Sequence, residues 1–311
     1  MSRGIVLRSH GPGEVLKADE LELVAKPGET LVEMRLAAVA QQDRTVLAGK
    51  QPTTPFVPGS EGAGIVVSSA VLEAGTSVVV RGEGVGLTRS GVWGQYAVVP
   101  DAAVHRLPSS LEPAVALALL APALTAHTAV RRVAGVVMGE MVVITGITIL
   151  VGRLSAAVAR SAGASRVIGL ASVGEDVDDT TELVDQIVRV DELGQVGREL
   201  PWCDAAIDLV GGPVLSGVLG HLSPGGRVAV LGYRAGEFTT IDLRQLIGRD
   251  LRLLPVNLQR TVLEPDAVGE ALANIAGVRW RPEYDVLPAD RIGAVLDPHA
   301  GRILLDLTAL G

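Results

Sequence analysis

From residue 141 to residue 257 the sequence alternates between strand-like and helix-like segments, and this alternation limits the possible fold more than any other feature. The strand-like segments are short, apolar and rich in β-branched residues; in order they read MVVITG, SRVIGLAS, AAIDLVGG, GRVAVLGY and DLRLLPVN. A helix from Gly152 to Ser161, a short acidic helix and PVLSGVLGHL lie between them. Apolar strands separated by helices are typical of a parallel sheet covered on both faces. We therefore predict a doubly wound α/β domain.

Residues 1 to about 107 have a different pattern. Short apolar runs bounded by turn signals, such as ETLVEMRLAAVA and GVWGQYAVVP, predict an all-β region of hairpins or a small barrel. The single cysteine, Cys203, excludes an internal disulfide. Its alternating neighbourhood, PWCDAAIDLVGG, indicates a core strand residue rather than a nucleophile.

Charge and hydropathy narrow the range of partners. The formal net charge is −8 and no long run of Lys or Arg occurs, so we expect neither nucleic acid nor an anionic membrane as a partner. The first residues, MSRGIVLRSHGPGEVLK, carry charges and glycines where a secretion signal needs an apolar run, and no stretch approaches about 18 uninterrupted apolar residues. We expect a cytoplasmic protein that binds a small-molecule substrate.

Several motifs that occur in a fixed order carry a family resemblance. They are GPGEVLKADELELVAKPGETLVEMRLAAVAQQD, FVPGSEGAGIVV, GVWGQYAVVP, LAPALTAHTAV, VVITG followed by VG, AAIDLVGG, LSPGGRVAVLG and GRILLDL. Over nearly its whole length the chain resembles a zinc-free member of the medium-chain dehydrogenase/reductase superfamily, in its quinone oxidoreductase and enoyl reductase branches. The resemblance implies an α/β architecture: a discontinuous GroES-like β-rich catalytic domain, residues 1–118 and 258–311, and a Rossmann-type nucleotide-binding domain, residues 119–257, with the active cleft between them.

The expectation of a zinc-free protein depends on two positions. Zinc-dependent relatives carry a cysteine three residues before the position of Asp43 and a histidine directly before that of Glu61. Here these positions hold Ala40 and Ser60, which cannot serve as zinc ligands because zinc sites use thiolate, imidazole or carboxylate groups. We predict no metal site.

The predicted nucleotide-binding turn, VVITGITILVGRLSAAVARSAGA, is unusual. Zinc-free relatives read Gly-x-x-Gly-x-x-Gly here; Gly146 and Gly152 keep the outer positions, Ile149 occupies the middle one and Leu150 follows. An isoleucine side chain that projects toward the diphosphate would displace it, and β-branching disfavours a positive φ. The turn residues that we assign to cofactor binding are Gly146, Ile149, Leu150, Val151 and Gly152.

The two ends of the expected cofactor give different signals. At the adenosine end, Ser172 closes VIGLAS without the carboxylate that favours NAD, while the acidic segment VGEDVDDTTELVDQ would repel the phosphate of NADP. These two signals do not distinguish the cofactors from each other, so the expected cofactor is either NADPH or NADH. At the nicotinamide end the resemblance assigns Thr125, Val210, Gly211, Leu231, Gly232 and Tyr233. The candidates for substrate polarisation or protonation are Gln42, Thr45, His127 and Tyr233, and Asp43 is expected to bind local backbone.

Three functions remain open. The first is a zinc-independent NAD(P)H-dependent reductase of a quinone, an enone or an enoyl-type substrate. The second is a cofactor-free member of the same fold that catalyses a redox-neutral cyclisation, isomerisation or dehydration of a hydrophobic intermediate. The third is a non-catalytic binding module. The last strand of the sheet, Asp250 to Asn257, would leave an apolar edge in a monomer, so we expect a homodimer through this edge.

Overall fold

The computed structural model divides into two compact units. Unit 1 comprises Met1–Leu120 and Arg281–Gly311, and unit 2 comprises Ala121–Trp280. The first boundary falls inside helix α2 (Pro113–His127), between Leu120 and Ala121 and next to Pro122. The structure describes residues 2–11, 16–48, 55–191, 196, 199–258, 266–279, 281–294 and 302–310.

Unit 1 contains a seven-stranded sheet in which most pairs are antiparallel. Six strands follow the order β14-β15-β3-β4-β5-β7, and β6 pairs with β3, while β1 and β2 form a separate antiparallel pair. The strands are β1 (Ser2–Arg8), β2 (Lys17–Leu23), β3 (Glu29–Ala38), β4 (Glu61–Ser68), β5 (Ser77–Arg81), β6 (Tyr96–Pro100), β7 (Val104–Arg106), β14 (Asp285–Pro288) and β15 (Ile303–Asp306). The helical segments of this unit before α2 are α1 (Gln41–Leu47) and the 3₁₀ turn η1 (Asp101–Ala103), and the 3₁₀ segment η4 (Ala289–Ala294) lies near the C-terminus. The predicted β-rich region is confirmed.

The core of unit 1 packs around a buried tryptophan. Trp93 is fully buried among side chains such as Val32 and Met34, and its indole N–H donates to the Ala38 carbonyl at 3.3 Å. A Cβ built on Gly59, whose φ is +101°, would lie 2.3 Å from the Trp93 ring. Glycine at this position therefore permits both the backbone conformation and the close packing of the ring.

Unit 2 contains the predicted parallel sheet, with six strands: the five predicted segments and β10, which is not among the segments predicted from the sequence. The strand order is β10-β9-β8-β11-β12-β13, and every pair in it is parallel. The strands are β8 (Met141–Thr145), β9 (Arg166–Ser172), β10 (Gln186–Val190), β11 (Cys203–Asp208), β12 (Leu222–Val230) and β13 (Arg252–Pro255). This is the 3-2-1-4-5-6 order of dinucleotide-binding folds, and the order reverses between β8 and β11.

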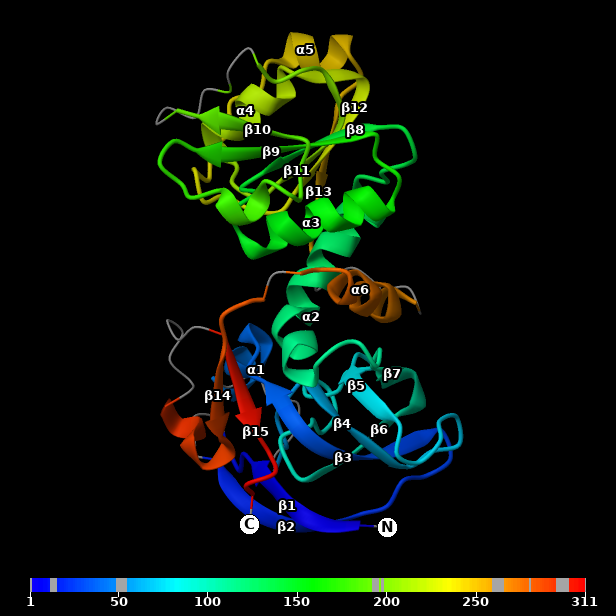
Figure 1. The fold of residues 1–311 in the computed structure, drawn as a ribbon. Helices are drawn as coiled ribbons and strands as arrows, with labels where there is room; N and C mark the ends of the chain where they lie inside the picture. The colour runs from blue at the N-terminus through cyan, green and yellow to red at the C-terminus, as the bar shows by residue number, and fades with distance from the viewer. Residues whose placement is uncertain are drawn as a thin grey trace. The chain divides into compact units, whose positions relative to one another are not determined.

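The helices of unit 2 cover both faces of this sheet. Helix α3 lies on one face and helices α4 and α5 on the other (Figure 1). The helices are α3 (Leu150–Ser161), α4 (Gly212–Leu219), α5 (Leu243–Gly248) and α6 (Ala267–Ala276), with the π-helix η2 (Thr128–Val133) directly after α2 and the 3₁₀ turn η3 (Asp178–Thr180) after β9. Helix α3 begins two residues before the predicted start at Gly152, and the predicted acidic helix is only the three-residue turn η3.

The second boundary between the units differs from the expected one. The resemblance assigned residues 258–311 to the first domain, but α6 groups with unit 2 and the boundary follows Trp280. The physical reason is that α6 packs against α3, with Leu272 and Ile275 buried. An amphipathic helix joins the unit that buries its apolar face.

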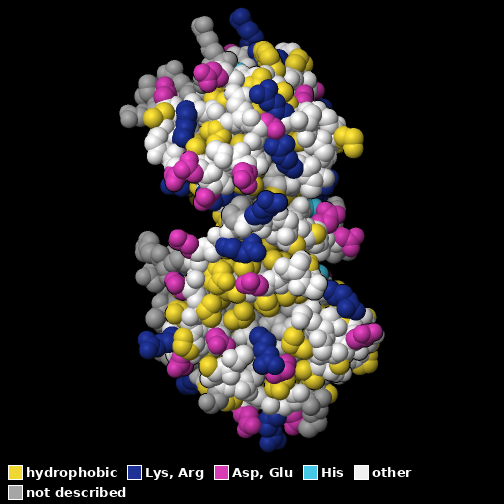
Figure 2. All heavy atoms as spheres, in the orientation of Figure 1, with side chains coloured by type: hydrophobic (Ala, Val, Ile, Leu, Met, Phe, Trp, Pro, Cys, Tyr) yellow, Lys and Arg dark blue, Asp and Glu magenta, His cyan; other side chains and the backbone are white. Residues whose placement is uncertain are grey.

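Three other features bear on the sequence-based expectations. Cys203 is buried at the start of β11, as predicted, and burial raises the pKa of its thiol to about 12. The segment Pro113–Val133 is long and apolar enough to cross a membrane, but 72% of its most apolar window is buried inside the protein, as in a core helix. On the face shown in Figure 2, basic and acidic side chains are interspersed without a continuous basic surface.

Candidate functional site

A pocket of about 260 Å³ opens in unit 2 where the strands of the parallel sheet end. It lies at the carboxyl ends of β8 to β12, which is where ligands bind in folds of this strand order. Its lining residues are Gly146, Ile149, Leu170, Ala171, Ser172, Glu175, Val190, Val210, Val214, Arg234 and Ala235. Four of the predicted cofactor-binding residues, Gly146, Ile149, Ser172 and Val210, are therefore in one pocket, which we call the strand-end pocket.

The turn between β8 and α3 needs glycine at both outer positions. Gly146 has a φ of +63°, and a Cβ on Gly152 would lie 2.3 Å from the Gly146 carbonyl oxygen. The middle position has no such requirement, because Ile149 has φ −81° and ψ 156°, an extended conformation that suits a β-branched residue. Ile149 therefore avoids the positive φ that β-branching disfavours.

The Ile149 side chain lies over the first glycine of the turn. A Cβ on Gly146 would lie 3.5 Å from Ile149 Cδ1 and 3.0 Å from Val210 Cγ1. The Ile149 amide donates to the Gly146 carbonyl at 3.2 Å, so the turn uses this N–H internally. The side chains of Ile149 and Val210 therefore narrow the pocket next to the backbone of Gly146.

Helix α3 presents its N-terminus at the same turn. Leu150, Val151 and Gly152 are its first three residues, and isoleucine at the N-cap offers no side-chain acceptor for their amides. The first N–H groups of a helix have no partner within it, and the helix dipole adds positive potential there. These amides can satisfy an anionic ligand group.

A buried polar network joins the two strands at which the strand order reverses. Thr145 Oγ1 donates to Asp208 Oδ1 at 2.8 Å and accepts the Leu209 amide at 2.9 Å, while the Gly211 amide donates to Asp208 Oδ2 at 3.0 Å. Thr145 and Asp208 are fully buried, and burial raises the pKa of Asp208 although these hydrogen bonds oppose the shift. The network holds the loop after β11 against β8. Sequence reasoning did not identify either residue, although each lies within a strand motif and is the last residue of its strand.

The predicted residues at the nicotinamide end form two closely packed loops after β11 and β12. A Cβ on Gly232 would lie 2.1 Å from the Leu209 carbonyl oxygen, and one on Gly211, whose φ is +66°, would lie 2.8 Å from the Gly232 carbonyl oxygen. Leu231 donates its amide to the Asp208 carbonyl at 2.8 Å. The Tyr233 side chain is 69% exposed. The glycines thus permit close backbone packing. The described residues that line the strand-end pocket do not include Gly211, Leu231, Gly232 or Tyr233.

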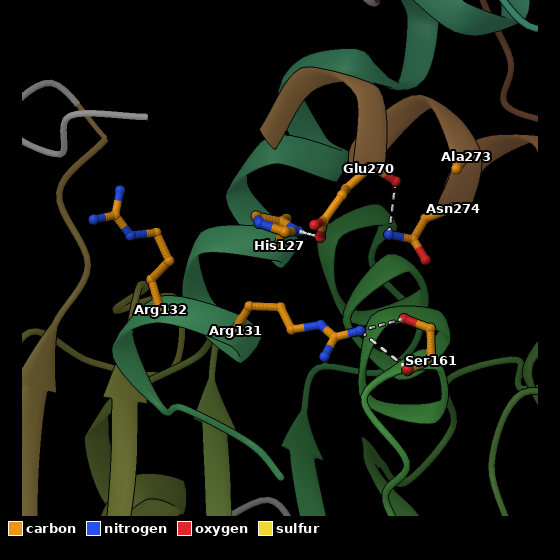
Figure 3. A pocket seen from close by; sticks show the side chains of 7 residues that line it. All are labelled: His127, Arg131, Arg132, Ser161, Glu270, Ala273 and Asn274. Atoms are coloured by element: carbon orange, nitrogen blue, oxygen red, sulfur yellow. Dashed lines mark hydrogen bonds and ion pairs between the residues drawn. The ribbon is translucent and has the colours of Figure 1, made fainter. Parts of the chain in front are cut away.

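His127 and Thr125, both on α2, lie elsewhere. Thr125 Oγ1 donates to the Ala121 carbonyl of its own helix at 2.8 Å. His127 lines a second pocket of about 650 Å³, where its Nδ1 lies 3.5 Å from Glu270 Oε2 on α6 and Arg131 donates to the Ser161 carbonyl at 3.0 Å (Figure 3). This pocket shares no described lining residue with the strand-end pocket.

The candidates in unit 1 lie on helix α1. Gln42 and Thr45 are half-buried on α1, and Asp43 between them is fully buried. Asp43 accepts the Ala40 amide at 2.8 Å and the Ser60 amide at 2.9 Å, which confirms its expected structural role. Burial raises the pKa of Asp43 to about 6, against the effect of these hydrogen bonds and of Arg81.

Ala40 and Ser60 stand where zinc-dependent relatives hold zinc ligands. Both donate their backbone amides to the same carboxylate, that of Asp43. The next residue, Glu61, is also buried and forms an ion pair with Arg81 on β5. Burial lowers the pKa of Arg81 to about 10, although Asp43 opposes this shift. Within the described residues, no group of three or more His, Cys, Asp or Glu side chains could hold a metal ion.

Sequence reasoning missed two charged residues of the strand-end pocket, Glu175 and Arg234. Glu175 belongs to the acidic segment after β9, for which the sequence predicts a short helix and repulsion of the NADP phosphate but no pocket-lining residue. The signal that could have identified it is Gly174, because a glycine one residue earlier permits a turn that returns the side chain to the strand end. Arg234 directly follows the predicted Leu231-Gly232-Tyr233 motif.

Comparison with known protein families covers the first part of the chain. Residues 26–109 match the alcohol dehydrogenase GroES-like domain.

Three relatives match over most of the chain. The zinc-type alcohol dehydrogenase-like protein C337.11 of Schizosaccharomyces pombe is 30% identical over 239 residues, which are 75% of this chain and 70% of that protein. Acrylyl-CoA reductase AcuI of Ruegeria pomeroyi is 30% identical over 94% of this chain and 88% of its own length. The quinone oxidoreductase of Homo sapiens is 27% identical over 83% of this chain and 80% of its own length.

Solved structures share the whole fold at lower identity. The crystal structure of AibC aligns with a TM-score of 0.77 and 24% identity over 98% of this chain and 95% of that one. The YhdH oxidoreductase of Salmonella enterica, solved in complex with NADP, aligns with a TM-score of 0.67 and 24% identity over 98% and 99% of the two chains. With a GroES-like unit, a 3-2-1-4-5-6 parallel sheet and relatives of this identity and coverage, the chain belongs to the medium-chain dehydrogenase/reductase superfamily of oxidoreductases.

Proposed function

We propose that this protein is a zinc-independent, NAD(P)H-dependent reductase of a quinone, an enone or an enoyl-type substrate. The observation that carries the proposal is the strand-end pocket, which lies at the N-terminus of α3 and at the reversal of strand order. The names of two relatives, acrylyl-CoA reductase and quinone oxidoreductase, support reduction of an electrophilic conjugated substrate. The nicotinamide ring, when bound, supplies the hydride.

The residues of the pocket suit the parts of a dinucleotide. Leu170, Ala171 and Val190 provide an apolar wall for a base at the ends of β9 and β10. Leu150 and Val151 are not among the described residues that line the pocket, but they follow Ile149, which does; their amides at the start of α3, together with Arg234, provide positive potential for the diphosphate. Val210, in the loop after β11, lines the pocket beside Gly146. The hydrogen bonds of Thr145 and Asp208 hold this loop in place.

Without a metal, hydrogen-bond donors of the protein must polarise the substrate oxygen. Gln42, Thr45 and Tyr233 remain the proposed donors, since amide and hydroxyl groups can donate to a developing enolate. His127 is a weaker candidate because its ring lies against Glu270 in the second pocket.

Titration with NADH and, separately, with NADPH tests the proposal, followed by nicotinamide fluorescence and by calorimetry. We expect binding of one of them in the micromolar range, and then oxidation of the bound cofactor by members of a panel of quinones and enones. Metal analysis of the purified protein is expected to give no stoichiometric zinc. Absence of binding up to millimolar concentrations of both cofactors would contradict the proposal.

One observation favours the second candidate, a cofactor-free enzyme with redox-neutral chemistry. Ile149 occupies the middle glycine position, where a diphosphate approaches the backbone in this fold, and its side chain and that of Val210 narrow the pocket over Gly146. Replacement Ile149→Ala distinguishes the two candidates, because alanine accepts the extended backbone at this position and removes only the side chain beyond Cβ. Binding that appears only in Ile149→Ala would identify the turn as blocked in the natural protein. The matched control is Ile241→Ala, whose side chain does not line the strand-end pocket.

A further inference from the structure

The end of β9 forms a tight turn that returns an acidic side chain to the strand-end pocket. The Glu175 amide donates to the Ser172 carbonyl at 3.2 Å, and Gly174 between them has a φ of +88°. Glu175 Oε2 in turn accepts the Ser172 amide at 3.0 Å. Two hydrogen bonds between the same pair of residues hold the carboxylate beside the last residue of β9, where it lines the pocket.

An arginine on the neighbouring strand braces this turn. Arg189 on β10 donates through one guanidinium nitrogen to the carbonyl of Ser172 at 3.0 Å and to that of Glu175 at 2.8 Å. Both acceptors belong to the backbone, and Arg189 is not one of the described residues that line the pocket. Its contacts fix the position of Glu175; the guanidinium keeps its positive charge, but the charged side chain that lines the pocket at the β9 end is Glu175.

The two charged residues of the pocket come from strands that are not neighbours. Glu175 follows β9 and Arg234 follows β12, and the strand order places β8 and β11 between them. At the β9 end the pocket is therefore lined by an acidic side chain, and the exposed Asp176 and Asp178 that come next in the chain add negative charge, whereas Asp179 is paired with Arg153 at 3.6 Å. In this fold the ribose of the adenosine lies at the end of the second strand, which is β9 here.

We propose that Glu175 selects NADH over NADPH, an inference that rests on the proposed function of the strand-end pocket. The Ser172 amide occupies one carboxylate oxygen, and the other remains as an acceptor for a ribose hydroxyl. A hydroxyl that donates to a carboxylate makes a strong, charge-assisted hydrogen bond. The 2′-phosphate of NADPH has no proton to donate at neutral pH in its dianionic form and would be repelled by the same group.

The test compares the affinities of both cofactors in three proteins: the natural chain, Glu175→Gln and the matched control Glu182→Gln. Glu182 is exposed, lies in the same acidic segment and does not line the pocket, so its replacement removes the same charge. Calorimetry and nicotinamide fluorescence give each dissociation constant, and circular dichroism confirms that each variant is folded.

We expect the natural chain and Glu182→Gln to bind NADH at least about tenfold more tightly than NADPH, and Glu175→Gln to lose most of this preference. Equal or tighter binding of NADPH by the natural chain would overturn the inference and leave the proposed function intact. An equal loss of preference in both variants would also overturn it, because general charge rather than Glu175 would then set the preference. Absence of binding of either cofactor would contradict the proposed function and this inference together.

Discussion

At the scale of single residues, the buried carboxylate of Asp43 makes a prediction about pH. Its folded-state pKa of about 6 lies above the ordinary value of 3.8, so the folded protein binds this proton more tightly than the unfolded chain does. Its contribution to the free energy of unfolding is therefore largest below pH 4, falls as pH rises from about 4 to 6, and is then constant. The total change is on the order of 3 kcal/mol.

Urea denaturation of the natural chain and of Asp43→Asn between pH 4 and pH 7 checks this expectation. The difference in unfolding free energy between the two proteins is expected to be larger at pH 4 than at pH 7. A difference that does not depend on pH would show that Asp43 titrates as it does in the unfolded chain.

A second residue-scale prediction concerns glycine in helices. Gly152→Ala places a Cβ 2.3 Å from a backbone carbonyl oxygen, so we expect a loss of about 1 to 3 kcal/mol despite the better helix propensity of alanine. In the matched change Gly269→Ala, in α6, the new Cβ meets no atom within 4 Å, and a gain of about 0.4 to 1 kcal/mol is expected. Chemical denaturation of both variants decides the matter; a loss of the same size in both would mean that close packing is not the cause.

At the scale of elements, the link between β8 and β11 predicts a joint effect on stability and binding. Thr145→Val keeps the shape of the side chain but leaves the Asp208 carboxylate and the Leu209 amide each without one buried partner. We expect the free energy of unfolding to fall by about 2 kcal/mol or more, together with weaker cofactor binding. Thr145→Ser keeps the hydroxyl and should retain most of both properties. Melting temperature and cofactor affinity are measured on each variant. A Thr145→Val variant as stable as the natural chain would show that these hydrogen bonds do not stabilise the site.

The sequence predicted elements better than it predicted side-chain directions. Apolar runs and their spacing depend on local chemistry, so the parallel sheet, the β-rich unit and the buried Cys203 could be predicted. The acidic segment after β9 was predicted as a helix because Asp and Glu suit a helix start, yet only Asp178–Thr180 is helical. For Glu175 the sequence offers one local signal, the turn at Gly174, but the position of its side chain depends also on Arg189, which lies 14 residues further along the chain.

At the scale of the whole molecule, the edge of the parallel sheet leads us to propose a homodimer. Within the described residues, strand β13 pairs with β12 on one side only, and Asp250 to Asn257 is the segment that we predict to pair with its copy. We expect size-exclusion chromatography with light scattering to give twice the chain mass at micromolar concentration. Monomers alone at that concentration would contradict the proposal.

The extended backbone at Ile149 has a consequence for how this family can diversify. Only the outer glycines of the turn are fixed by geometry, so the middle residue can change its side-chain volume without a change of fold. We propose that the side-chain volume at this position sets how closely a diphosphate can approach the turn. Valine and then alanine in place of isoleucine would widen the approach stepwise on an unchanged backbone, and phenylalanine would narrow it.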